Sequence, residues 1–182
     1  KLNNFIKICL LENTLTNLVL ANILLKKKFN VDIISQSKQP LLTNTIRTIA
    51  ISNENYQFLR QNIKGFSNFG WPTDKIKIYS AKKKSSELFE FKNKNQSNFF
   101  LIKYSVLYNL MKKNKSLKFI FIKNYNLNDI KNRDYNLIIN SEQNNPITKK
   151  YFQKQIEKNY KSLAHTAIID HKKIENKTAS QI

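Results

Sequence analysis

The first residues able to bind a ligand stand at the start of an expected helix near the N-terminus. Residues 8–11 form a short apolar run, and the polar residues Glu12, Asn13 and Thr14 follow it directly. Asparagine and threonine are common helix N-caps, so Asn13 or Thr14 is expected to begin a helix. The first turn of a helix has backbone N–H groups without intrahelical acceptors, and such groups bind anions. The sequence therefore predicts an anion-binding helix N-terminus, which the capping side chain would partly occupy.

Other kinds of catalytic chemistry find no support in the residue pattern. The sequence has no metal-ligand spacing, no Walker loop and no serine-nucleophile elbow. Its single cysteine, Cys9, lies inside the first apolar run and is expected to be an inert packing thiol. One cysteine cannot form an intrachain disulfide, which fits a reducing compartment.

A strand–helix–strand pattern positions this helix start. One face of the expected helix holds Leu15, Leu18, Val19, Asn22 and Leu25, and the apolar run 31–34 follows it. Strand, helix and strand within about 30 residues form the parallel crossover unit. Further strands are expected at 76–79, 88–91, 117–122, 137–139 and 164–169, and further helices at 54–62, 103–113 and 148–157. The predicted fold class is α/β with a mixed sheet.

Composition and charge describe a basic chain that can bury a core. It has 182 residues, 41% of them hydrophobic, and a net charge of +20. The excess positive charge comes from lysines, which are spread along the chain beside many asparagines and isoleucines. This composition is typical of proteins encoded by AT-rich genomes. Arginine binds phosphates better than lysine does, yet the only arginines in the sequence are Arg47, Arg60 and Arg133. A nucleic-acid-binding domain is therefore the least favoured interpretation, whereas attraction to anionic lipid stays open.

The segment KICLLENTLTNLVLANILLKKKFNVDIIS has the layout of a Rossmann-type flavin-binding start. Such a unit has a strand, then Gly-x-Gly-x-x-Gly, a helix, and a second strand that ends in an acidic residue. Without gaps, the three glycine positions fall on Glu12, Thr14 and Asn17, and the acidic position falls on Ser35. The glycine that usually precedes the second strand falls on Lys28. The layout is kept while the signature residues are replaced.

Later segments extend this resemblance in the same order along the chain. In the flavin-dependent hydroxylases of ubiquinone biosynthesis, an arginine precedes Ala-hydrophobic-Ser and a Gly-Trp follows; Arg47, Gly70 and Trp71 stand at these places. The family's Val-Leu helix resembles LIKYSVLYNLM. Its Gly-Ala-Asp-Gly stretch resembles YNLIINSEQNNPITKKYF, in which Glu142 stands for the aspartate.

Residues 1–182 thus resemble the N-terminal part of such a hydroxylase, as one Rossmann-like FAD-binding domain whose C-terminal complement is expected outside this chain. The resemblance implies FAD as cofactor, NAD(P)H as reductant and a prenylated aromatic ring as substrate. It assigns no catalytic residue. It also implies a cytoplasmic protein peripheral to the inner membrane, with other ubiquinone-biosynthesis enzymes as partners. The cofactor-binding positions that it implies are Glu12, Thr14, Asn17, Ser35, Arg47 and Glu142.

The substitutions at these positions favour a second interpretation. Glu12 would bring a negative charge beside the cofactor phosphates, and two unit charges about 4 Å apart repel by roughly 4 kcal/mol at an effective dielectric near 20. Thr14 would place a branched side chain where phosphates approach the backbone, and Asn17 would push the helix away from the strand. The alternative is a non-catalytic family member that serves as a structural or assembly partner in the same pathway.

Overall fold

A computed structural model of the chain describes residues 6–38, 47–80, 86–92, 97–152, 158–163, 172 and 177–181. The chain divides into two units, one formed by Lys1–Thr45 and Leu107–His165 and the other by Ile46–Val106 and Thr166–Ile182. The expected strand at 164–169 and the second half of the helix expected at 148–157 lie outside the described residues.

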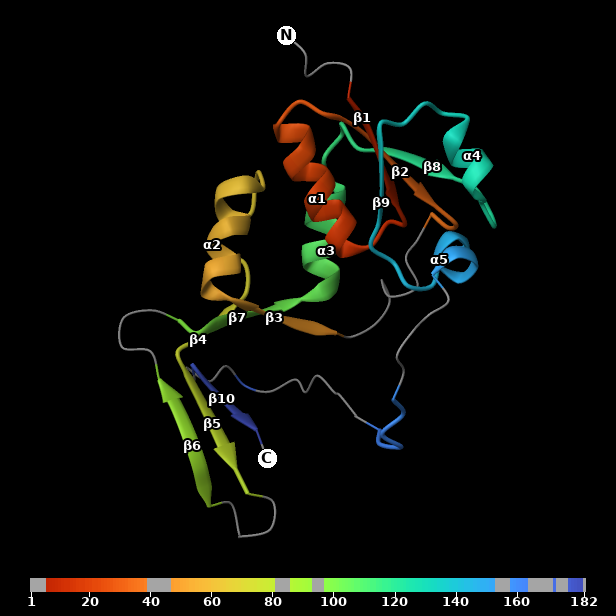
Figure 1. Cartoon of the computed structure of the whole chain (residues 1–182). Helices are drawn as coiled ribbons and strands as arrows, with labels where there is room; N and C mark the ends of the chain where they lie inside the picture. The colour runs from red at the N-terminus through yellow and green to blue at the C-terminus, as the bar shows by residue number, and fades with distance from the viewer. Residues whose placement is uncertain are drawn as a thin grey trace. The chain divides into compact units, whose positions relative to one another are not determined.

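The first unit is built on a four-stranded parallel sheet (Figure 1). In β1, Cys9 lies opposite Asp32 of one neighbouring strand and Ile138 of the other. A strand with a neighbour on each side and helices packed on its face is apolar along its whole length. This explains the apolar run at residues 8–11. The predicted parallel crossover and its strands are confirmed. In spatial order the strands are β8 (Lys118–Phe121), β2 (Asn30–Ser35), β1 (Lys7–Leu11) and β9 (Leu137–Asn140).

Helices follow three strands of this sheet along the chain. Helix α1 (Leu15–Lys26) connects β1 to β2, as predicted. The helices α4 (Leu127–Lys131) and α5 (Pro146–Tyr151) follow β8 and β9. The sequence did not predict α4, because five residues are too few to show a helical period. A buried cluster joins these helices to the sheet, with the members Cys9, Leu11, Ile34, Tyr125, Ile130 and Ile147.

The second unit holds two three-stranded sheets. One is antiparallel, whereas the other is mixed, since β10 runs parallel and β6 antiparallel to β5. The pairing predicted between 76–79 and 88–91 is confirmed, as is the mixed α/β class. The first sheet consists of β3 (Thr48–Ser52), β7 (Phe99–Lys103) and β4 (Trp71–Thr73), and the second of β10 (Thr178–Gln181), β5 (Lys75–Tyr79) and β6 (Glu87–Lys92).

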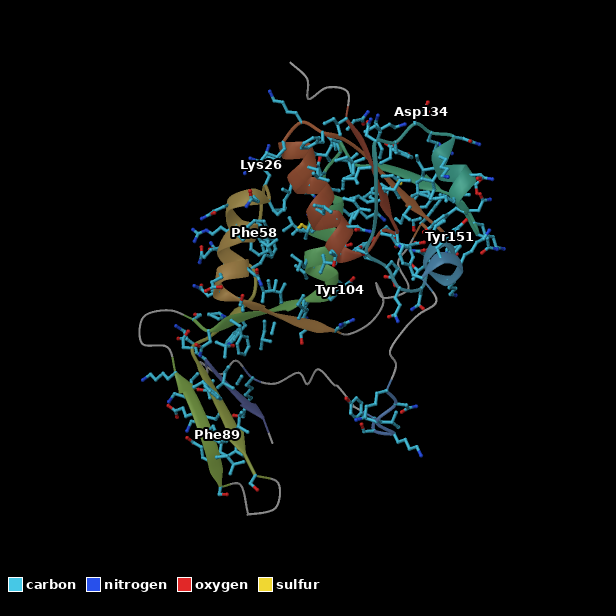
Figure 2. The ribbon with its side chains drawn as sticks, in the orientation of Figure 1. Lys26, Phe58, Phe89, Tyr104, Asp134 and Tyr151 are labelled. Carbon is cyan, nitrogen blue, oxygen red and sulfur yellow. The ribbon has the colours of Figure 1, made fainter. Side chains whose placement is uncertain are left out.

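Helix α2 (Asn53–Asn62) packs on the antiparallel sheet through an aromatic contact. The ring of Tyr56 stacks on Phe100 of β7, with 3.8 Å between ring centroids. Ser52 caps this helix by accepting from the Asn55 N–H at 3.3 Å. Helix α3 (Tyr104–Lys112) begins in this unit and ends in the first one. Figure 2 labels Tyr104 at its start and Phe89 on β6, where the Phe89 side chain is 62% exposed.

The end of α1 forms a Schellman motif without its usual glycine. The Phe29 N–H donates to the Leu24 carbonyl at 3.1 Å and the Lys28 N–H to the Leu25 carbonyl at 2.9 Å. Lys28 has φ 68°, the left-handed conformation in which helices commonly end with glycine. Lys28 stands where the resemblance places a glycine, and its backbone therefore has the left-handed conformation that glycine usually adopts there.

Replacing this lysine should relieve backbone strain. Lys28→Gly is expected to raise the free energy of unfolding by about 1 kcal/mol, because a non-glycine residue at positive φ costs about that much. Urea unfolding measures the change. The control is Lys27→Gly at the preceding exposed position, where φ is −83° and glycine should destabilise the protein. Equal effects of the two substitutions would contradict the assignment of strain to Lys28.

Candidate functional site

Polar residues gather where the parallel strands of the first unit end. Glu12 follows β1, Gln36 follows β2 and Ser141 follows β9. The chain leaves β1 for β2 through α1, whereas β9 pairs with the opposite side of β1. The strand order therefore reverses beside β1, and open α/β sheets bind ligands at such a switch point. This edge of the sheet is the candidate site.

The loop from β1 to α1 keeps a glycine-like turn although it contains no glycine. Glu12 has φ 74°, and its N–H donates to the Ile34 carbonyl at 2.7 Å. Thr14 is extended, with φ −72°, and its hydroxyl oxygen accepts from the Asn17 N–H at 3.3 Å. Of the two predicted N-cap candidates, Asn13 and Thr14, it is Thr14 that caps α1. The turn of the fingerprint is thus preserved, and the cap occupies one N–H group of the first helical turn.

The carboxylate of Glu12 lies at the end of β2, where four donors surround it. Oε2 accepts from the Ser35 hydroxyl at 2.9 Å and from the Gln36 N–H at 3.3 Å. Oε1 accepts from the Tyr125 hydroxyl at 2.9 Å and from Nε2 of Gln36 at 3.2 Å. Glu12 is 9% exposed, and a carboxylate has about four lone-pair sites. The negative charge of Glu12 is thus held beside Ser35, where the resemblance places an acidic residue.

Asn17 connects three segments beneath the loop. It is completely buried, and its Nδ2 donates to the carbonyls of Leu11 at 2.6 Å and Glu12 at 2.8 Å. Its Oδ1 accepts from the Ser141 hydroxyl at 2.7 Å. The amide therefore fills the space between α1 and the end of β1 with hydrogen bonds, and it joins that loop to the residue after β9.

Glu142 contributes mainly its backbone to the neighbouring loop. Its carbonyl accepts from Nδ2 of Asn145 at 3.0 Å and from the Thr148 hydroxyl at 2.7 Å, and both donors belong to the start of α5. Its carboxylate accepts from the Asn144 N–H at 3.1 Å. The side chain of Glu142 thus stabilises its own loop, beside Ser141 and the Asn17 contact.

Arg47 lies in the second unit. Its side chain is exposed, its guanidinium lies 5.7 Å from the centre of the Tyr104 ring, and its carbonyl accepts from the Tyr104 N–H at 2.8 Å. The structure therefore brings Glu12, Thr14, Asn17 and Ser35 into one constellation with the loop of Glu142, all within the first unit. Arg47 belongs to the other unit.

Burial keeps the Cys9 thiol and the Tyr125 hydroxyl protonated. It raises the pKa of the Cys9 thiol to about 12, with the negative charge of Asp32 adding to the effect. Burial also raises the pKa of the Tyr125 hydroxyl well above its usual range, and the charge and hydrogen bond of Glu12 raise it further. Cys9 is therefore a protonated packing residue at neutral pH, and Tyr125 is a stable hydrogen-bond donor to Glu12.

Sequence reasoning missed three members of the site: Gln36, Tyr125 and Ser141. Tyr125 comes from the loop after β8, 113 residues from Glu12, and nothing in the local pattern signals that contact. Ser141 and Gln36 each lie two residues after a predicted strand, which is a weak signal, because ligands bind outside the carboxyl ends of parallel strands. Among the described residues, no group of acidic, histidine and cysteine side chains could hold a metal ion. No helix in the described ranges is long and apolar enough to span a bilayer.

Solved structures share this fold, whereas no family model and no curated protein matches the chain. The p-nitrophenol 4-monooxygenase PnpA from Pseudomonas putida DLL-E4 is 8% identical and matches with a TM-score of 0.51 over 64% of this chain and 32% of that one. HpxO from Klebsiella pneumoniae, crystallised with FAD and uric acid, is 13% identical, with a TM-score of 0.50 over 64% and 31%. The chain therefore spans about a third of the length of each. Over the matched part, the chain shares the fold of these two proteins.

The buried amide of Asn17 should contribute strongly to stability. Asn17→Ala leaves the carbonyls of Leu11 and Glu12 and the Ser141 hydroxyl each without one partner. We expect a loss of about 2–3 kcal/mol in the free energy of unfolding, measured by urea denaturation. The control is Asn128→Ala at an exposed asparagine of α4, which should change stability by less than about 1 kcal/mol. Equal losses would show that the Asn17 contacts are dispensable.

The Tyr125 hydroxyl should make stability depend on alkaline pH. Its pKa is raised in the folded state, so its contribution is present below the unfolded value of about 10 and declines as pH rises above that value. Wild-type protein is expected to lose stability above about pH 10, and Tyr125→Phe to lose less over the same range. Urea unfolding at a series of pH values measures both slopes. Tyr160→Phe, at a residue that is 74% exposed, is the control; parallel slopes for Tyr125→Phe and wild type would contradict the prediction.

Proposed function

We propose that this chain is the nucleotide-binding part of an FAD-dependent monooxygenase. The observation that carries the proposal is the combination of a left-handed turn at Glu12, a helix that begins three residues after it, and a carboxylate at the end of β2. These are the parts with which dinucleotide-binding folds hold a pyrophosphate and a ribose. Fold similarity to HpxO, a protein crystallised with FAD, supports the choice of cofactor.

The residues present fit this cofactor in two respects and resist it in one. The Leu15 and Thr16 N–H groups, in the first turn of α1, would face the pyrophosphate, and the Glu12 carboxylate lies at the end of β2, the usual position of the ribose acid. The extended backbone of Thr14 needs no glycine, but its side chain narrows the approach of phosphates to the loop. FAD would supply the oxygen chemistry when bound, with NAD(P)H as reductant, while the protein binds, orients and shields the reacting groups.

The substrate class rests on the sequence resemblance. Arg47, Gly70, Trp71 and Glu142 stand where the ubiquinone-biosynthesis hydroxylases have their corresponding residues, so we propose a prenylated aromatic ring as substrate. Such a substrate is lipid-soluble, and a net charge of +20 favours contact with an anionic membrane surface. A protein peripheral to the inner membrane, in contact with other enzymes of the pathway, fits both features.

A second candidate function is that of a non-catalytic partner with the same fold. The observation in its favour is that the polar groups of the site already satisfy one another: four donors saturate Glu12, and Asn17 bonds to two loop carbonyls. A ligand would have to compete with these internal hydrogen bonds. A fold can be retained after its original activity is lost.

Flavin content separates the two candidates. The natural full-length protein is purified gently, and the flavin released by denaturation is measured from its visible absorbance. Near-stoichiometric FAD is expected, and protein stripped of cofactor should take up added FAD. A folded protein without flavin, which also fails to bind excess FAD, would overturn the monooxygenase proposal and leave the partner function.

A further inference from the structure

A carboxylate stands at the end of β2 although the strand itself ends in serine. The acidic residue that binds ribose in dinucleotide-binding folds usually closes this strand, and here Ser35 occupies its place. The Glu12 carboxylate reaches the same position from the neighbouring loop, with Oε2 2.9 Å from the Ser35 hydroxyl oxygen. The carboxylate thus comes from the loop after β1 instead of from the end of β2, while its location in the fold is nearly the same.

Two of the four groups that donate hydrogen bonds to Glu12 can leave the carboxylate and donate to another acceptor. The Ser35 hydroxyl has a second acceptor in the Ser37 carbonyl, 3.0 Å away. Nε2 of Gln36 belongs to a partly exposed side chain, so water can replace the carboxylate as its acceptor. One of these donors occupies Oε2 and the other Oε1. Their departure would free one acceptor position on each carboxylate oxygen, which is the arrangement that two vicinal hydroxyl groups require.

The other two donors are held in place. The Tyr125 hydroxyl belongs to a completely buried side chain, and the Gln36 N–H is part of the backbone directly after β2. They keep one hydrogen bond on each carboxylate oxygen, so Glu12 stays oriented and its charge stays stabilised while the other positions exchange. Burial raises the pKa of Tyr125, which keeps this hydroxyl protonated as a donor.

We infer that Glu12 accepts the vicinal 2′- and 3′-hydroxyl groups of the cofactor's adenosine ribose, in place of the acidic residue missing from the end of β2. The inference rests on the proposed FAD binding and assigns one residue within it. It also explains why a glutamate is tolerated at a left-handed position: the strained backbone points a carboxylate at the ribose subsite. On this assignment Ser35 and Gln36 hold the carboxylate in the free protein and release it to the ribose.

The test moves the carboxylate back to its usual strand. FAD affinity is measured by calorimetry for wild type, Glu12→Gln, Glu12→Gly and the double variant Glu12→Gly/Ser35→Asp, all in the full-length protein. Both single variants should bind FAD roughly tenfold to hundredfold more weakly, because a charge-assisted pair of hydrogen bonds is lost. The double variant should recover most of the loss. Circular dichroism and thermal unfolding verify that each variant folds, and Glu12→Gln keeps the side-chain volume in case glycine at this position destabilises the loop.

A second readout tests the ribose itself. ADP and 2′-deoxy-ADP serve as probes, since they share every group except one hydroxyl. Wild type should prefer ADP by about tenfold, the expected effect of one hydrogen bond to a charged acceptor, and Glu12→Gln should lose most of that preference. If wild type binds FAD while the Glu12 variants bind it equally or more tightly, the inference is wrong and the proposed function stands. If wild type binds neither FAD nor ADP, the proposed function fails and the inference fails with it.

Discussion

The buried carboxylate of Glu12 is the constraint on which the site depends. A charge removed from water costs several kcal/mol unless hydrogen bonds replace its hydration. Here the replacements come from the end of β2 and from the loop after β8, through Ser35, Gln36 and Tyr125. Three loops at one edge of the sheet are therefore fixed by the requirement to stabilise a single negative charge.

The same requirement explains the backbone of the first loop. A left-handed glutamate is strained, and such a conformation persists only where the surrounding structure holds it. The Glu12 N–H is bonded to β2, the side chain is held at the end of that strand, and the carbonyl is bonded to Asn17. Backbone and side chain are thus constrained from both sides, and the turn of a glycine-rich fingerprint survives without glycine. Lys28 keeps a left-handed residue at the end of α1 by the same kind of local hydrogen bonding.

Fold and ligand chemistry place separate demands on this sequence. The fold requires buried apolar strands and a tight turn, and β1, β2 and their crossover supply both. A cofactor requires free polar groups and room for phosphates, and here the polar groups are engaged with one another. An exchange of hydrogen-bond partners at Glu12 would reconcile the two demands, since Ser35 already has a second acceptor.

Much of the fold could be predicted from local pattern. Apolar runs and helical spacing identified β1, α1, β2, α2 and the β5–β6 pair, because each is long enough to display its period. Two short elements were not predicted: β4 has three residues and contains Pro72, and α4 has five residues. Thr14, one of the two predicted N-cap candidates, is the cap; such a cap could be predicted because it depends on a neighbour three residues away.

The sequence by itself determined which residues stand at the positions that the resemblance gives to the cofactor, and that they are not the usual ones. Only the tertiary structure decided what those residues do. The expectation for Glu12 placed its charge beside phosphates, because the sequence gives a position along the chain and no side-chain direction. The contacts that set that direction come from Ser35 and Tyr125, 23 and 113 residues away, and they form only when parallel strands bring their ends to one edge. Long-range packing, which a local pattern does not encode, therefore places the Glu12 carboxylate at the end of β2. From the sequence alone, the same substitution suggested repulsion of the cofactor phosphates.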